Sequence, residues 1–153
     1  MKNPDTVFAE ARVLETLFPE SRSDEFFDAL FGDATEGAYN IKLRYGAYDA
    51  KSGALTFFLD LLQRPGKCLA CNLTSGLPDV FARHPVINIR GLVAGTERLL
   101  EARCTGWELG RTRQEEPTRY CIPLVLSLSG SFSLKLIGRK KKKSSTAIGK
   151  IKN

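Results

Sequence analysis

The sequence predicts an α+β fold, with an antiparallel sheet of four or five strands and helices packed mainly on one face. Apolar residues recur at helical spacing near the start of the chain and again over 85–101. They alternate with polar residues over 38–48, 54–63 and 118–128, as strands require. Because the strands come in adjacent pairs separated by helices, hairpins are favoured over parallel crossovers. The expected order is helix, helix, strand, strand, repeated once.

The first half is expected to begin with two helices. Residues 4–18 carry apolar side chains three and four positions apart, and Pro19 ends that helix. Ser23 then has the character of an N-cap, because two acids follow it in the first turn. The second helix has a strongly aromatic face, made of Phe26, Phe27, Leu30 and Phe31.

A hairpin is expected next. Residues 38–48 alternate like a half-solvated strand, and residues 49–53 have the composition of a turn. The second strand, 54–63, carries apolar side chains on both faces. It is therefore expected to be central or covered.

The second half repeats the plan after a connector. A short helix is expected to begin near Pro78. An apolar stripe predicts one helix over 85–101, and the alternative is a strand at 86–89 followed by a shorter helix.

Two strands follow, at 103–112 and 118–128, with a turn at 114–117 between them. Pro123 lies inside the second of these strands, which predicts an edge or a bulge there because proline lacks a backbone donor. A weaker alternation over 131–137 allows a fifth strand.

The length of 153 residues fits a single domain over 1–137, followed by a basic tail over 138–153. The halves 4–64 and 75–128 share one order of elements, which suggests a repeat without residue-level similarity. Seven of the 23 Lys and Arg residues lie after position 138, where no acid occurs, and the other 16 stand against 17 acids. The net charge of +6 therefore belongs to the tail.

The tail has three interpretations. Its basic run can contact nucleic-acid phosphates or an anionic membrane surface, in both cases with strong salt dependence. It can also offer a contact for a protein, or simply keep the chain end solvated. The residues concerned are Arg139, Lys140, Lys141, Lys142 and Lys143.

The sequence predicts a cytoplasmic protein. It has no run of 18 apolar residues, so no transmembrane segment is expected, and no apolar signal-type segment follows Met1. In a reducing compartment, the four cysteines are expected to be thiols or metal ligands rather than disulfides.

The cysteines suggest a zinc site. Cys68 and Cys71 form a C-x2-C pair, and His84, the only histidine, follows at the spacing of a third ligand. No second histidine follows, so Cys104 or Cys121 would have to complete a Cys3His site through folding. The alternative is that Cys104 and Cys121 are small buried residues and that His84 caps the helix after it.

A thiol-dependent activity is another interpretation of Cys68 and Cys71. A reactive C-x2-C usually opens a helix, which lowers the pKa of its first thiol. Here the residues after Cys71 have the composition of a loop, although Lys67 would favour a thiolate. Covalent haem attachment is excluded, because position 72 is asparagine instead of histidine.

Other enzyme classes lack their motifs. The chain has one histidine and no G-x-S-x-G, which leaves little for a hydrolase triad, and it has no glycine-rich phosphate loop. The leading expectation is therefore a non-enzymatic intracellular binding or interaction domain. Its expected functional surface is the thiol-bearing loop together with the pocket between the helices and the sheet.

Two blocks of the sequence carry a resemblance. Residues 26–45 read FFDALFGDATEGAYNIKLRY and residues 63–88 read QRPGKCLACNLTSGLPDVFARHPVIN. They resemble a small uncharacterised bacterial family whose members are sometimes labelled pancreas/duodenum homeobox protein 1. The resemblance implies no activity and no site residue. The homeobox label conflicts with the expected elements, because a homeodomain is a three-helix unit with a basic recognition helix.

Overall fold

In this computed structural model the described residues are 1–129. The helices, in chain order, are α1 (Pro4–Val7), α2 (Ala11–Leu17), α3 (Arg22–Phe31), the 3-10 helix η1 (Ala34–Glu36), the 3-10 helix η2 (Ala70–Asn72), α4 (Leu77–Arg83) and α5 (Ile89–Leu100). The strands are β1 (Tyr39–Asp49), β2 (Ala54–Gln63), β3 (Arg103–Leu109), β4 (Arg113–Glu116) and β5 (Arg119–Ser129).

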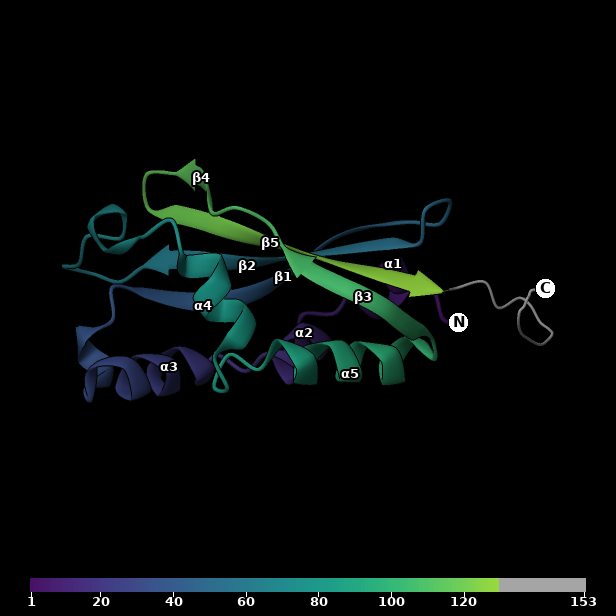
Figure 1. Cartoon of the computed structure of the whole chain (residues 1–153), viewed down its shortest axis with the longest axis horizontal. Coiled ribbons are helices and arrows are strands. Elements are labelled where there is room, and N and C mark those ends of the chain that lie inside the picture. Colours follow the sequence, from purple (N-terminus) through teal and green to yellow (C-terminus); the bar gives the residue numbers. More distant parts are fainter. Residues whose placement is uncertain (130–153) are drawn as a thin grey trace.

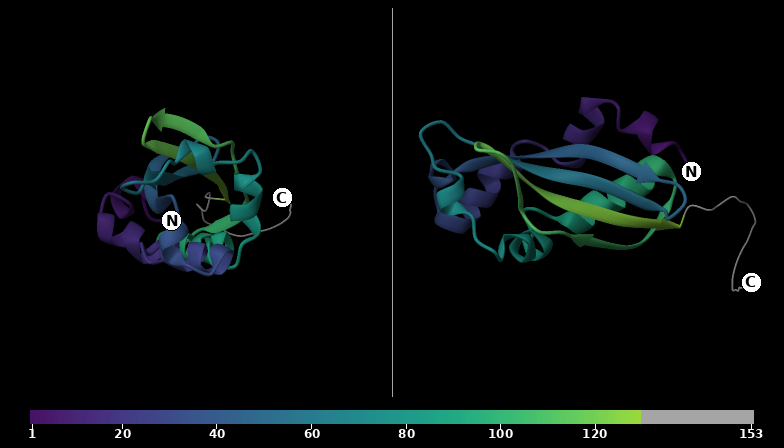
Figure 2. Two further views of the ribbon diagram at one scale, coloured as in Figure 1. Left: turned by 90° about the vertical axis from the view of Figure 1, so that its left-hand side faces the viewer. Right: turned by 90° about the horizontal axis from the view of Figure 1, so that it is seen from above.

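The strands form one antiparallel sheet in the order β1-β2-β5-β3, and β4 pairs with β5 beside β3. Figure 1 shows α3 and α5 in a layer on one side of the sheet, with β4 next to β5 and away from these helices. Seen from above, β1, β2 and β5 run side by side over the helices (Figure 2). The predicted α+β class and antiparallel sheet are confirmed.

The core lies between the sheet and the helices. As expected, β2 is central, and it contributes four side chains with no exposed surface to the inner face: Leu55, Phe57, Leu59 and Leu61. In the register, Leu59 lies between Leu43 of β1 and Ile122 of β5, both buried. Burial of each such side chain contributes about 1.5 to 3 kcal/mol relative to exposure.

The outer face of the sheet carries a charged cluster. Asp60 of β2 is 6% exposed, and Arg44 donates two hydrogen bonds to its carboxylate, at 2.8 and 3.0 Å. Arg119 of β5 adds a longer ion pair to Asp60 at 3.7 Å. The guanidinium of Arg44 also lies 4.5 Å from the ring centre of Phe58. These contacts satisfy the buried carboxylate, which would otherwise be costly to desolvate.

The prediction of a single helix over 4–18 is wrong, because the chain forms α1 and α2 with a break between them. Asn3 caps α1 by accepting a hydrogen bond from Asp5 N. At the break, Phe8 turns inward and is 2% exposed, with its ring 5.1 Å from that of Phe57. The free energy gained by burying Phe8 in the core thus exceeds the cost of interrupting the helix.

The helix predicted over 85–101 begins four residues later, at Ile89. Asn88 has a positive φ of 51°, and its side chain accepts a hydrogen bond from Gly91 N at 3.1 Å. This cap fixes the start of α5. The alternative strand at 86–89 does not form either, since residues 85–87 make a turn.

The last strands also differ from the prediction. The strand predicted at 103–112 ends at Leu109, and the turn predicted at 114–117 is mostly β4. Pro123 lies in a strand flanked on both sides, so it is not at an edge. Its carbonyl accepts from Gly110 N, at the gap between β3 and β4. In an antiparallel strand the backbone N and O of one residue point to the same neighbour. The nitrogen of Pro123, which has no hydrogen to donate, therefore faces Gly110 beyond the end of β3, and the pairing with β2 is not interrupted.

Three expectations lie partly or wholly outside residues 1–129. They are the strand at 131–137, the domain boundary at 137 and the basic tail. The suggested repeat of 4–64 and 75–128 stays a prediction. None of the helices in residues 1–129 combines the length and apolarity needed to cross a bilayer.

Ser23 serves β1 instead of capping α3. The N-cap position is Ser21, whose side chain makes no capping hydrogen bond. The buried Ser23 hydroxyl accepts from Ile41 N at 2.8 Å and donates to Ile41 O at 3.4 Å. It thereby satisfies the outward-facing backbone groups of an edge strand and fixes α3 beside β1.

We expect Ser23→Ala to lower the free energy of unfolding by about 1 to 3 kcal/mol, because Ile41 N–H is left buried without an acceptor. The matched control is Ser21→Ala, two residues earlier at the exposed N-cap, which should change stability little. Urea unfolding of both variants measures this. Equal effects of the two substitutions would contradict the role assigned to Ser23.

Candidate binding groove

An apolar groove lies where α3 and α4 meet the start of β1. It has a volume of about 230 Å³. Its lining comes from α3, from residues 38 and 39 at the start of β1, from α4, and from Asn72 and Thr74 in the segment before α4. The apolar side chains that line it include Phe26, Phe27, Leu30, Phe31, Tyr39, Leu77 and Val80.

Three of these side chains are unusually exposed. Leu30 is 48% exposed, Phe31 54% and Val80 37%. Within residues 1–129, Met1 is the one other large apolar residue classed as exposed. Since the three gather around one cavity instead of being scattered, they form a contiguous apolar patch of the kind found at interaction sites.

A series of aromatic contacts makes the groove floor rigid. The ring of Phe27 lies 4.9 Å from Tyr39 and 5.2 Å from Phe26, both edge to face. Phe26 in turn contacts Phe81 of α4 at 5.4 Å. Exposed Phe31 stacks on Phe27 at 5.9 Å. The exposed ring of Phe31 is therefore in contact with rings that belong to the core. Each aromatic pair of this kind contributes about 0.5 to 1.5 kcal/mol to stability in addition to the burial of its apolar surface.

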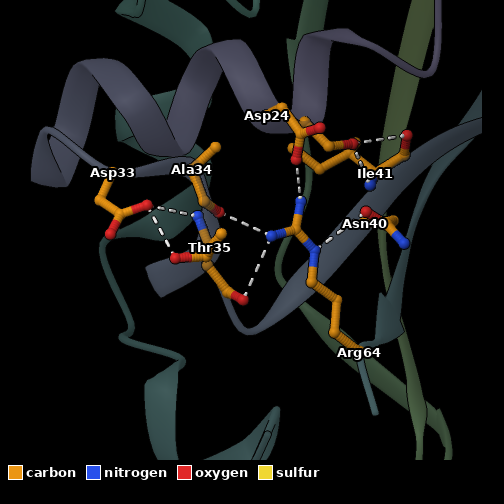
Figure 3. Close-up of polar contacts among 9 residues, drawn as sticks. Asp24, Asp33, Ala34, Thr35, Asn40, Ile41 and Arg64 are labelled. Carbon is orange, nitrogen blue, oxygen red and sulfur yellow. Dashed lines mark hydrogen bonds and ion pairs between the residues drawn. The ribbon is translucent and has the colours of Figure 1, made fainter.

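Arg64, just after β2, fixes α3 and η1 at the end of the sheet (Figure 3). Its guanidinium donates to Asp24 at 2.7 Å, to Asn40 at 3.0 Å and to the carbonyl of Ala34 at 2.8 Å. A longer bond reaches Gly37 O at 3.4 Å. The Arg64 side chain is only 14% exposed, so its bonds to Asn40 and Ala34 O are partly shielded from water, whereas Asp24 is 68% exposed.

The same guanidinium lies 5.3 Å from the ring centre of Phe27. This ring also packs directly on Gly37, where a Cβ atom would overlap it. Phe27 is thus held by contacts with both Arg64 and a glycine backbone, which fix the position of the groove floor.

The segment that contributes α3 to the groove, residues 22–36, is acidic. From residue 22 to residue 36, Arg22 is the only base, and the acids are Asp24, Glu25, Asp28, Asp33 and Glu36. Asp28 precedes Phe31 by one helical turn, and Asp33 follows it by two residues. Hydrogen bonds from the Thr35 hydroxyl and amide lower the pKa of the Asp33 carboxyl. Asp24 is paired with Arg64, whereas the other acids of this segment form no ion pair within residues 1–129.

Cys68 and Cys71 lie beside the groove and are joined by a disulfide. The prediction that all four cysteines are thiols or metal ligands is therefore wrong for this pair. Leu69 between them is fully buried, and Leu69 N donates to the Gln63 side chain at 3.0 Å. The Asn72 amide donates to Cys68 O at 2.6 Å, and Asn72 also lines the groove.

The disulfide closes a loop of very few residues. In the chain-entropy description such a short loop adds only about 2 kcal/mol of stability, less than a long one. The turn is in addition held by the burial of Leu69 and by the side chains of Gln63 and Asn72. The fold around the turn therefore depends little on the bond between the two sulfur atoms.

The predicted zinc ligands do not come together. Cys104 pairs with Leu128 at one end of β5, whereas Cys68 and Cys71 follow the part of β2 that pairs with the other end. The separation along the strands is roughly 30 Å at about 3.4 Å per residue. In residues 1–129 no three His, Cys, Asp or Glu side chains are grouped so that they could hold a metal ion.

His84 ends α4 and has a packing role. Its ring lies 4.9 Å from that of Phe26, edge to face. Its Nδ1 accepts a hydrogen bond from Val86 N at 3.2 Å. The imidazole therefore supports the aromatic floor of the groove and the turn before α5.

The free cysteines are poor nucleophiles. Cys121 is fully buried, and burial together with a hydrogen bond to Glu115 raises the pKa of its thiol. Cys104 is half-buried, donates to Gly106 O, and its thiol pKa is also raised by burial. A raised pKa lowers the thiolate fraction at neutral pH. The sequence-based alternative of structural thiols fits both residues.

The predicted nucleic-acid-binding residues lie outside the described part of the chain. They are Arg139, Lys140, Lys141, Lys142 and Lys143.

The groove residues were only partly foreseeable. The aromatic face of α3 is visible in the sequence, where Phe26 and Leu30, and Phe27 and Phe31, form two adjacent rows at a spacing of four. These two rows make the apolar face of this short helix wider than packing against a single core surface requires. The position of Val80 opposite them depends on tertiary packing that no local pattern encodes.

Comparison of the chain with protein-family models, with curated proteins and with solved structures gives no match.

We expect Arg64→Lys to lower the free energy of unfolding by about 2 to 3 kcal/mol, because one ammonium group cannot reach Asp24, Asn40 and Ala34 O together. Arg111→Lys is the matched control: Arg111 is exposed and has no ion pair or side-chain hydrogen bond to residues 1–129. Thermal and urea unfolding measure both. If the two variants were equally stable, Arg64 would not hold α3.

Proposed function

We propose that this chain is a binding domain that holds an apolar side chain of a partner polypeptide in the groove between α3 and α4. The observation that carries the proposal is the clustering of Leu30, Phe31 and Val80 around a single apolar cavity. Exposing these side chains to water is unfavourable for the isolated chain. A partner that covers them recovers that free energy, about 1.5 to 3 kcal/mol for each large side chain.

The size of the cavity favours a side chain over a small molecule. Pockets for drug-sized ligands typically measure about 300 to 1,000 Å³, whereas this groove measures about 230 Å³. Its floor is rigid, because Phe27 is fixed by Arg64 and Gly37. A rigid pocket that accepts one anchoring side chain is typical of interface hot spots.

The charge around the groove indicates what flanks the anchor. The acids Asp28 and Asp33 lie close to Phe31 along the chain, and Glu25 and Glu36 extend the acidic surface. A partner segment with Lys or Arg beside its apolar anchor would meet this surface favourably. Such rim charges mainly raise the association rate and give salt dependence.

Several sequence-based expectations stay predictions. They are the cytoplasmic location, the family resemblance and the salt-sensitive binding of nucleic acid, protein or an anionic surface by the basic tail.

We expect Val80→Ser to weaken binding of groove ligands about tenfold, since the apolar contact contributes of the order of 1.4 kcal/mol. The ligands come from a random peptide library selected on the wild-type protein, with dissociation constants measured by titration. Selected peptides should share a Leu, Phe or Trp anchor with Lys or Arg beside it.

Val125→Ser is the matched control. Val125 is half-buried on β5, and it alternates with Leu124 and Leu126, so it lies on the outer face, away from the groove. This variant should bind the selected peptides like the wild type. An equal loss of peptide affinity in both variants, or selected peptides without an apolar anchor, would contradict the proposal.

A further inference from the structure

We propose that Cys68 and Cys71 exchange disulfides with cysteine thiols of the polypeptide held in the groove. The inference rests on the proposed function, and it adds a reaction and a class of substrate to that site. The substrate is a cysteine-containing polypeptide with an apolar anchor next to basic residues.

The disulfide is placed for this chemistry. Cys71 is followed directly by Asn72, which lines the groove, so the two Cα atoms are about 3.8 Å apart. The Asn72 side chain also donates to Cys68 O, which couples the groove wall to the first cysteine. A polypeptide anchored in the groove therefore has its neighbouring residues within reach of the sulfur atoms.

The two cysteines are also accessible. Both are exposed, whereas Leu69 between them is fully buried and holds the turn in place. Because Leu69, Gln63 and Asn72 already fix the turn, the sulfur–sulfur bond can open without loss of the fold. An exposed disulfide that adds little stability is of the labile, exchanging kind.

The surroundings distinguish the two sulfur atoms. Cys71 N donates a hydrogen bond to Cys68 Sγ at 3.2 Å. When the disulfide opens, this donor stabilises a thiolate on Cys68, and neighbouring Lys67 adds positive charge. A stabilised Cys68 thiolate leaves readily from a mixed disulfide, so the second step, which releases the oxidised polypeptide, is favoured when Cys68 carries that disulfide.

The exchange balances without another reagent. A thiolate of the bound polypeptide attacks Cys68 Sγ, the bond to Cys71 breaks, and Cys71 leaves with the electron pair and takes up a proton. A second thiolate of the polypeptide then attacks its own sulfur in the mixed disulfide, and Cys68 leaves as a thiolate. The polypeptide is oxidised to a disulfide, and the protein is reduced to a dithiol.

The test uses two reduced synthetic peptides with the full-length oxidised protein. Each peptide contains two cysteines and flanking lysines; one has a leucine anchor and the other has serine in its place. We expect the anchored peptide to reduce Cys68–Cys71 about tenfold faster at equal concentration, because it is held in the groove. Mass spectrometry of alkylated samples gives the reduced fraction over time.

Phe31→Ser provides the matched variant. It alters an exposed groove residue, so it should remove the advantage of the anchored peptide, while dithiothreitol reduces variant and wild type at equal rates. A second measurement assigns the sulfur atoms. For this measurement the anchored peptide carries one cysteine, activated as a mixed disulfide. The reduced Cys71→Ser variant, which reacts through Cys68, should capture this peptide faster than the reduced Cys68→Ser variant, which reacts through Cys71. The reverse order would overturn the assignment.

A cysteine-free version of the anchored peptide separates this inference from the proposed function. If the cysteine-free peptide binds the wild type but the two dithiol peptides react at equal rates, the exchange is disproved and the proposed binding in the groove is retained. If it does not bind, the proposed function fails, and the exchange fails with it.

Discussion

The guanidinium of Arg64 contacts three parts of the chain that lie 24, 30 and 40 residues before it. It donates to Asp24 on α3, to Ala34 O on η1 and to Asn40 on β1, at distances from 2.7 to 3.0 Å. Its planar, forked donors suit this task, which a single ammonium group could not perform. Since the same group also lies over the ring of Phe27, the position of α3 and the floor of the groove are set by one side chain.

This arrangement explains why α3 exposes apolar surface. The first turn of α3 is fixed to the sheet by two adjacent residues, Ser23 on Ile41 and Asp24 on Arg64. With the helix held in this orientation, Phe26 and Phe27 face the core, and Leu30 and Phe31 in the last turn extend past it. The polar anchors thus place an apolar end of α3 opposite Val80, beside the disulfide turn.

Patterns that depend on neighbouring residues could be read from the sequence. The alternation of β1, β2 and β5 and the apolar run of β2 predicted a central strand in an antiparallel sheet. Features decided by distant contacts could not. Phe8 breaks the first helix because Phe57 and Tyr45 offer a buried site, and Ser23 serves Ile41 of an edge strand that the local pattern does not reveal. The C-x2-C spacing fits metal ligands and a disulfide equally, and the placement of Cys104 at the far end of the sheet decides against a shared metal.

The central claim is that the groove between α3 and α4 is the surface where a partner binds. Methyl NMR spectra of the full-length protein, recorded during titration with a lysine-flanked leucine peptide, test it most directly. The account predicts that the methyl signals of Leu30, Leu77 and Val80 shift together and saturate, while those of Val125 stay in place. Shifts confined to the outer face of the sheet, or no saturable shift in the groove, would contradict it.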